Sequence, residues 1–204
     1  MAALVQPGNL PYPELNNTDY AAGVWYSSGP GNWSAASGNA MVSGTVSLIP
    51  FIPRFTHTFT ALGWWHNSAA QTGHNLRLGI YDSTNGKPSG AALVDSGSIA
   101  TTAAVAFRTS GAISQTLRAG HLYYLASNAD STLAGGEWTP PTLSYNPAWV
   151  TTGIIDPATA FGASATGLFA GFTQTSAYGA FPTIATLVDN AQATVNVPLI
   201  FLKG

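Results

Sequence analysis

The chain has 204 residues, of which only 6 are Lys or Arg and 8 are Asp or Glu. A charged fraction of 7%, against about 25% in ordinary soluble domains, and a net charge of −2 exclude the basic surface that nucleic acids and anionic membranes bind, so we expect neither as a partner. The hydrophobic fraction of 46% excludes a disordered chain, and the absence of cysteine excludes disulfides, thiol catalysis and thiolate metal sites.

Residues 1–42 differ in composition from the rest of the chain and predict an irregular N-terminal arm. The segment contains four Pro among repeated Gly and Asn, and it shows neither a helical nor a strand period. Such a segment is a linker, or an arm that becomes ordered by docking on another surface. Tryptophan has no role in a solvated linker, so we expect docking. The aromatic residues available for it are Tyr12, Tyr20, Trp25, Tyr26 and Trp33.

Residues 43–204 consist of a series of predicted short strands. Apolar runs are bounded by Gly, Pro, Asn and Ser, which is typical of strands joined by tight turns. In one run, Leu76, Leu78 and Ile80 share one face, and Arg77 and Tyr81 lie on the other. The predicted strands are 44–50, 55–65, 76–81, 91–95, 112–118, 121–127, 167–173 and 195–202.

This many short strands predicts an all-β domain with little helix. The economical arrangement is a jelly-roll-like antiparallel β-sandwich over residues 43–204. The Ala-rich stretch 100–106 is not expected to be helical, because it contains β-branched Thr and Val and no apolar stripe. Arg77 stands between two leucines, so we expect it to pair with a carboxylate such as Asp95.

Signatures of catalysis and cofactor binding are missing from the sequence. None of the four histidines adjoins a Glu, and no two are four residues apart, which excludes the zinc-protease helix motif. No Gly-x-Ser-x-Gly elbow occurs. The Gly-Pro-Gly at 29–31 lacks the third glycine and the flanking strand and helix of a dinucleotide loop. We therefore predict a protein that is not an enzyme and that holds no cofactor or metal.

Two acidic loops allow alternative interpretations. Residues 82–87 offer Asp82 and Asn85 as calcium ligands, but calcium takes six to eight oxygens, so an Asn-Gly hairpin turn is favoured. In the second loop, Asp130 and Glu137 beside Trp138 have the residue types of a glycosidase carboxylate pair. Two acids in one long loop are more often solvated than catalytic, so a glycan depolymerase is the less favoured alternative.

The adjacent Trp64 and Trp65 end a predicted strand, so their side chains must point to opposite faces. One then lies in the core and the other is exposed or at an interface, unless loops of the same domain cover both. An exposed indole on a charge-poor surface suits stacking on a sugar ring or packing on a neighbouring chain. The candidate glycan or interface contacts are Trp64, Trp65, His66 and Trp138.

A series of segments follows an order that resembles a known family. They include Pro-Phe-Ile-Pro-Arg, Leu-Arg-Leu-Gly-Ile-Tyr, an Asp-Ser-Gly strand end and Tyr-Gly-Ala-Phe-Pro, and they lie at 47–54, 59–65, 76–81, 86–88, 95–97, 117–126, 178–182 and 197–202. This series resembles the β-sandwich domain of tailed-bacteriophage virion proteins, such as minor tail proteins, tail or head fibres and receptor-binding tips. The resemblance covers about residues 46–202.

The resemblance implies a structural protein of the virion, made in the host cytoplasm and displayed on the particle, where it contacts the host surface. It implies no catalytic residues. Residues 1–42 lie outside it, and we expect them to dock on other virion proteins. By analogy with phage fibres, and because large uncharged patches suit a subunit interface, we expect a homotrimer. The alternatives are a carbohydrate-binding module that reads host glycans and, less favoured, the glycan depolymerase.

Overall fold

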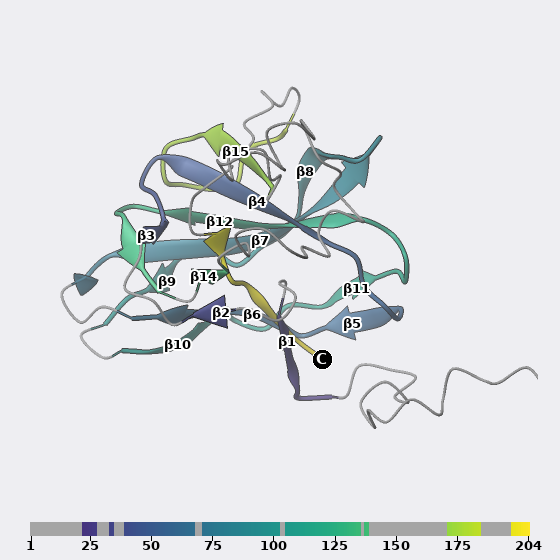
Figure 1. The fold of residues 1–204 in the computed structure, drawn as a ribbon, viewed down its shortest axis with the longest axis horizontal. Coiled ribbons are helices and arrows are strands. Elements are labelled where there is room, and N and C mark those ends of the chain that lie inside the picture. The colour runs from purple at the N-terminus through teal and green to yellow at the C-terminus, as the bar shows by residue number, and fades with distance from the viewer. Residues whose placement is uncertain are drawn as a thin grey trace, which may run out of the picture.

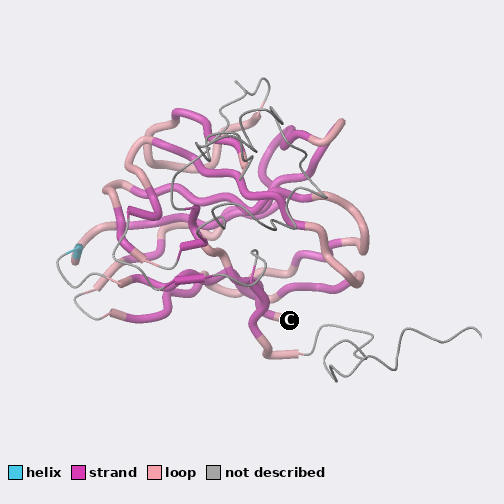
Figure 2. The backbone as a smooth tube through the Cα atoms, in the orientation of Figure 1, coloured by secondary structure: helices cyan, strands magenta, loops and turns pink. Residues whose placement is uncertain are grey.

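The computed structural model describes residues 22–27, 33–34, 39–67, 71–102, 105–135, 137–138, 171–184 and 197–204. These residues form antiparallel strands and loops, with one short helical turn at Gln71 (Figure 2). The strands lie in two main layers, one across the upper half and one across the lower half of Figure 1. The predicted all-β antiparallel sandwich is confirmed. No helix in the described ranges is long and apolar enough to cross a membrane.

The first sheet has the order β15–β4–β12–β7–β8, and a further strand pairs with the start of β7. Its strands are β15 (Phe172–Thr175), β4 (Thr45–Phe51), β12 (Tyr123–Ala129), β7 (Asn75–Thr84), β8 (Lys87–Asp95) and β9 (Ile99–Ala100). β7 and β8 form a hairpin in which Asn85 and Gly86 have φ angles of 53° and 76°, the left-handed conformation that a type I′ turn needs. The predicted Asn-Gly turn is therefore confirmed.

The second sheet has the order β1–β17–β6–β10. Its strands are β1 (Trp25–Ser27), β17 (Phe201–Lys203), β6 (Ala61–His66) and β10 (Ala106–Thr109). A separate pair, β5 (His57–Phe59) with β11 (Gln115–Leu117), lies next to it along the chain. The backbone N–H groups of Ser110 and Ile113 donate to the carbonyls of Leu62 and Thr60, and these hydrogen bonds connect the β5–β11 pair to the second sheet. The predicted strand 55–65 is thus interrupted at Thr60, where the pairing changes.

Parts of the predicted arm are strands of the sandwich, which corrects the prediction for those residues. β1 pairs with β17, and β3 (Asn39–Met41) pairs with β13 (Leu133–Ala134). β2 (Trp33–Ser34) pairs with β14 (Glu137–Trp138), which also pairs with β16 (Val197–Pro198). Strands of two or three residues are too short to show a period, so their partners decide their structure. Tyr12 and Tyr20 lie outside the described residues, and docking by residues 1–21 stays a prediction.

The main core lies between the two sheets. Leu76, Leu78 and Ile80 of β7 are fully buried there, as their alternation predicted, and Leu62 and Trp64 of β6 face the same core. Because successive strand residues point to opposite faces, this alternation also sends Arg77, Gly79 and Tyr81 to the outer face of the first sheet. The other core residues are Met41, Ile49, Phe59, Ile99, Leu117, Tyr123, Leu125, Ala129, Leu133, Leu199, Ile200 and Leu202.

The outer face of the first sheet is buried as well. Residues 176–184, which we call the strap, follow β15, and their side chains Phe181 and Ile184 pack with the residues of this face. As a result every residue of β12 is buried, although the strand alternates between the two faces. The buried residues of this second cluster are Val46, Leu48, Tyr81, Tyr124, Ala126, Phe172 and Ile184.

The carboxylate of Asp95, at the end of β8, fastens the strap. Both of its oxygens lie 2.8 Å from an Arg77 nitrogen, which confirms the predicted ion pair. The backbone N–H of Gly97 donates to one oxygen at 2.9 Å, and that of Phe181 in the strap donates to the other at 3.1 Å. The Arg77 guanidinium lies 5.8 Å from the ring centre of Tyr178. One carboxylate thus joins β7, β8 and the strap.

Two aromatic contacts also attach the strap, beside the backbone hydrogen bonds between Gly90 and Ile184 at 2.8 and 3.0 Å. The Phe181 ring covers Gly79, where a Cβ would come within 2.6 Å of the ring and 2.7 Å of the Val94 carbonyl oxygen. Tyr81 meets Phe181 edge-on at 6.0 Å and donates a 2.7 Å hydrogen bond to the Pro182 carbonyl. Burial, with the charge of Asp95, raises the pKa of Tyr81 above its ordinary value, so the phenol stays a neutral donor.

We predict that Asp95→Ala costs about 1–2 kcal/mol of unfolding free energy, because it removes a partly exposed carboxylate that accepts hydrogen bonds from Arg77, Gly97 and Phe181. Urea denaturation measures this loss. The control is Asp82→Ala, which removes a more exposed carboxylate and should cost less than about 1 kcal/mol. Equal losses in the two variants would contradict the role assigned to Asp95.

Candidate functional site

The two adjacent tryptophans of β6 lie as the sequence predicted, on opposite faces of the second sheet. Trp64 is 0% exposed and belongs to the main core, and His66, two residues on, is also 0% exposed. Trp65 points to the outer face and is partly exposed. Of these three candidate contact residues, only Trp65 is therefore accessible to a partner.

Trp65 shares the outer face of the second sheet with aromatic residues from three other strands. Phe107 of β10 is its cross-strand partner, and Phe201 of β17 pairs with Gly63 of β6. Trp25 of β1 meets Phe107 edge-on, with 4.8 Å between ring centres, and Phe107 meets Phe201 at 5.3 Å. We call the four partly exposed rings of Trp25, Trp65, Phe107 and Phe201 the outer aromatic face.

Gly63 allows these rings to meet. It lies at the centre of the sheet, and a Cβ on it would come within 2.7 Å of Phe107 Cε1 and 3.0 Å of Trp25 Cζ3. The rings of Trp25 and Phe107 therefore approach each other directly above its backbone, from the two edge strands of the sheet. A glycine inside a strand often marks such a close approach.

Polar side chains on this face are few: strand alternation places Ser27 of β1, Thr109 of β10 and Lys203 of β17 there. Lys203 is opposite Trp25 on one side and Ala61 on the other. Its ammonium makes no ion pair in the described part of the chain. The indole Nε1–H of Trp65 is buried and has no acceptor among the described residues. This N–H has almost no accessible surface, so it is not available to a ligand on the face.

The other predicted contact residues are placed differently. Tyr26 of β1 is opposite Leu202 and packs against the main core, so it is a structural residue here. Trp33 and Trp138 are register partners in β2 and β14, and their side chains are outside the described part of the structure.

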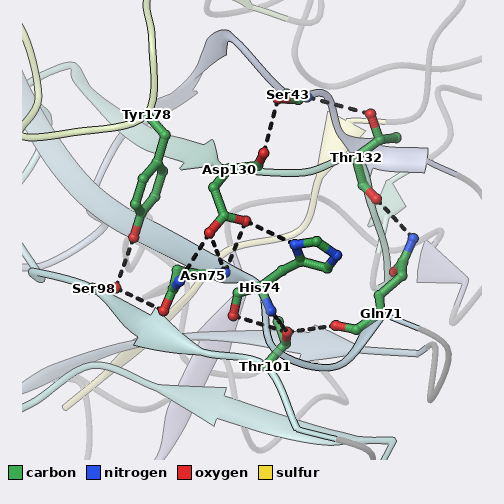
Figure 3. A network of polar contacts seen from close by, with 9 residues as sticks. All are labelled: Ser43, Gln71, His74, Asn75, Ser98, Thr101, Asp130, Thr132 and Tyr178. Atoms are coloured by element: carbon green, nitrogen blue, oxygen red, sulfur yellow. Dashed lines mark hydrogen bonds and ion pairs between the residues drawn. The ribbon is translucent and has the colours of Figure 1, made fainter.

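A polar network joins the loops around Asp130, the residue considered for a carboxylate pair (Figure 3). The backbone N–H of Asn75 lies 3.0 Å from both Asp130 oxygens, and its side-chain amide donates to one of them at 2.9 Å. His74 Nδ1 is 3.4 Å from the other oxygen. Asp130 thus holds the start of β7 against the end of β12. The Glu137 side chain is outside the described residues.

The network continues on both sides of Asn75. The Asn75 side-chain oxygen accepts a hydrogen bond from Ser98 at 3.0 Å, and Ser98 is 2.9 Å from the Tyr178 hydroxyl in the strap. On the other side, Thr101 donates to the Gln71 carbonyl at 2.6 Å. These contacts hold loops in place and link the network to the strap. Its members are Ser43, Gln71, His74, Asn75, Ser98, Thr101, Asp130, Thr132 and Tyr178.

Asp82 is held by a neighbouring histidine. His121 Nε2 lies 2.6 Å from an Asp82 oxygen, and the Ser83 N–H donates to the same oxygen at 2.7 Å. Burial disfavours ionisation of Asp82, but these hydrogen bonds and the charges of His121 and Arg118 outweigh it and lower its pKa. Among the residues described, no three His, Asp or Glu side chains gather as metal ligands would.

Comparison with known protein families found no matching family, and comparison with curated proteins found no match either. The outer aromatic face is therefore assigned from its geometry alone. Sequence reasoning singled out Trp25 and Trp65 separately but missed Phe107 and Phe201. Their signal is alternation: Phe201 and Lys203 flank the buried Leu202, as exposed-face residues of a strand do.

We predict that Gly63→Ala destabilises the chain by about 1–3 kcal/mol and alters tryptophan fluorescence, because its Cβ would force Trp25 and Phe107 apart. Chemical denaturation and emission spectra measure the two effects. Gly111→Ala is the control, since a Cβ there meets nothing within 4 Å. Unchanged emission in Gly63→Ala would show that the rings do not meet over Gly63.

Proposed function

We propose that the chain is a non-catalytic structural protein displayed on a virion, and that its outer aromatic face binds a glycan of the host surface. The observation that carries the proposal is the gathering of Trp25, Trp65, Phe107 and Phe201 on one partly exposed sheet face. Binding sites for small molecules are mostly apolar and aromatic, with a few polar groups that fix orientation. This face has that composition, with Ser27, Thr109 and Lys203 as the polar side chains.

The chemistry of sugars fits such a face. A pyranose ring has an apolar face of C–H groups and a rim of hydroxyls, and aromatic side chains supply large apolar area at little entropic cost. Only 7% of the residues are charged, so the surface has few charges with which to bind a ligand. Packing of aromatic rings against the uncharged face of a sugar does not need them. Glycan binding therefore explains the aromatic residues better than recognition of a strongly charged partner does.

The virion context rests on the resemblance described above. Several of its segments meet at one place, because Arg77, Gly79, Asp95, Tyr178 and Phe181 all take part in fastening the strap. These residues are far apart in the sequence but meet where the strap is attached. This supports the interpretation that the segments belong together, as parts of one type of β-sandwich domain. We propose further that residues 1–21 dock on other virion proteins and that the chain assembles as a homotrimer.

Binding to a glycan array tests the function. We expect Trp65→Ala and Phe107→Ala to weaken binding at least tenfold, because each removes an aromatic contact from the centre of the face. Leu93→Ala is the control: it truncates a 42% exposed side chain on β8 of the first sheet and should bind normally. Equal binding by all three variants would show that the glycan does not bind at this face.

Analytical ultracentrifugation at micromolar concentration tests the assembly. A trimer sediments with about three times the chain mass of 21.0 kDa. Because we assign the outer aromatic face to glycan, Trp65→Ala should leave this mass unchanged. A soluble species of 21.0 kDa in the unsubstituted chain would contradict the trimer.

A further inference from the structure

The positive charge of Lys203 indicates which kind of glycan the outer aromatic face would bind. This inference rests on the proposed glycan function. We propose that the face binds a saccharide that bears a carboxylate, with the carboxylate against Lys203 and a sugar ring against Trp25. The two residues are direct cross-strand partners on β17 and β1, so one sugar unit can reach both.

Among the described residues, Lys203 is a cation without an ion-pair partner. Only 6 residues are Lys or Arg, and Arg77 is neutralised by the two oxygens of Asp95. Lys203 has no such partner in the described part of the chain. Its neighbours on the face are aromatic rings, Ala61 and Gly63, and no Asp or Glu occurs among the described residues of the four strands. An anion on the ligand would supply the missing partner.

The hydrogen-bonding groups of the face point to the same chemistry. The Lys203 ammonium can only donate hydrogen bonds, and the hydroxyls of Ser27 and Thr109 on the same face can donate or accept. A carboxylate can only accept, so it matches the lysine, and the hydroxyls of a sugar match Ser27 and Thr109. One lysine also balances the single charge of a carboxylate, whereas a phosphate monoester carries about −1.5 to −2 near neutral pH.

Isothermal titration at low salt with two matched pairs of probes tests the inference: sialyllactose with lactose, and a galacturonic acid trimer with its methyl ester. In each pair only the first member carries a carboxylate. We expect the acidic member of at least one pair to bind about fivefold more tightly than its neutral partner, as for an exposed ion pair. Lys203→Gln should abolish that preference, and added salt should reduce it.

The control is Lys87→Gln, which makes the same charge change on β8 of the first sheet and should keep the preference. Equal binding of acidic and neutral members, or a preference that survives Lys203→Gln, overturns the inference while the proposed function stands. Absence of binding by all four probes also overturns the inference, and binding on the glycan array then shows whether the proposed function stands without it. If Trp25→Ala then also dissociates the oligomer, the face is a contact between copies of this chain.

Discussion

The carboxylate of Asp95 determines how the first sheet is covered. It accepts hydrogen bonds from Arg77, Gly97 and Phe181, and so connects a central strand, the end of an edge strand and the strap. With the strap in place, Tyr81 and Tyr124 are buried under it rather than exposed. The Tyr81–Pro182 hydrogen bond and the backbone pair between Gly90 and Ile184 attach the strap as well. Asp95 is the charged contact among these, and it joins three segments at one point.

The two sheets differ as a consequence. The first is buried on its inner face by the main core and on its outer face by the strap, and β12 at its centre has no exposed residue. The outer face of the second sheet carries partly exposed Trp25 and Phe107, which pack on each other over Gly63. On that face Phe107 also meets Phe201, so aromatic rings from three strands pack together there.

Local patterns in the sequence predicted much of this fold but little of the site. Alternation along 76–81 and the lone charge of Arg77 correctly predicted a strand with one core face and the pair with Asp95, because both depend on neighbouring residues. The place of Trp25 depends on the pairing of β1 with β17, near the opposite end of the chain, which no local period encodes. Its contact with Phe107 requires, in addition, the order of four strands and a glycine between them.

The residues that fasten the fold and those that form the candidate site are largely different. Arg77, Gly79 and Asp95 belong to segments that carry the resemblance to virion proteins, and their contacts lie on the first sheet. Trp25, Phe107 and Lys203 belong to none of these segments, whereas Trp65 and Phe201 lie in two others, and all five are on the second sheet. The closure of the first sheet and the composition of the outer aromatic face therefore depend on different residues. Because the two sets are attached to different sheets, substitutions on that face can change the partner without disturbing the strap.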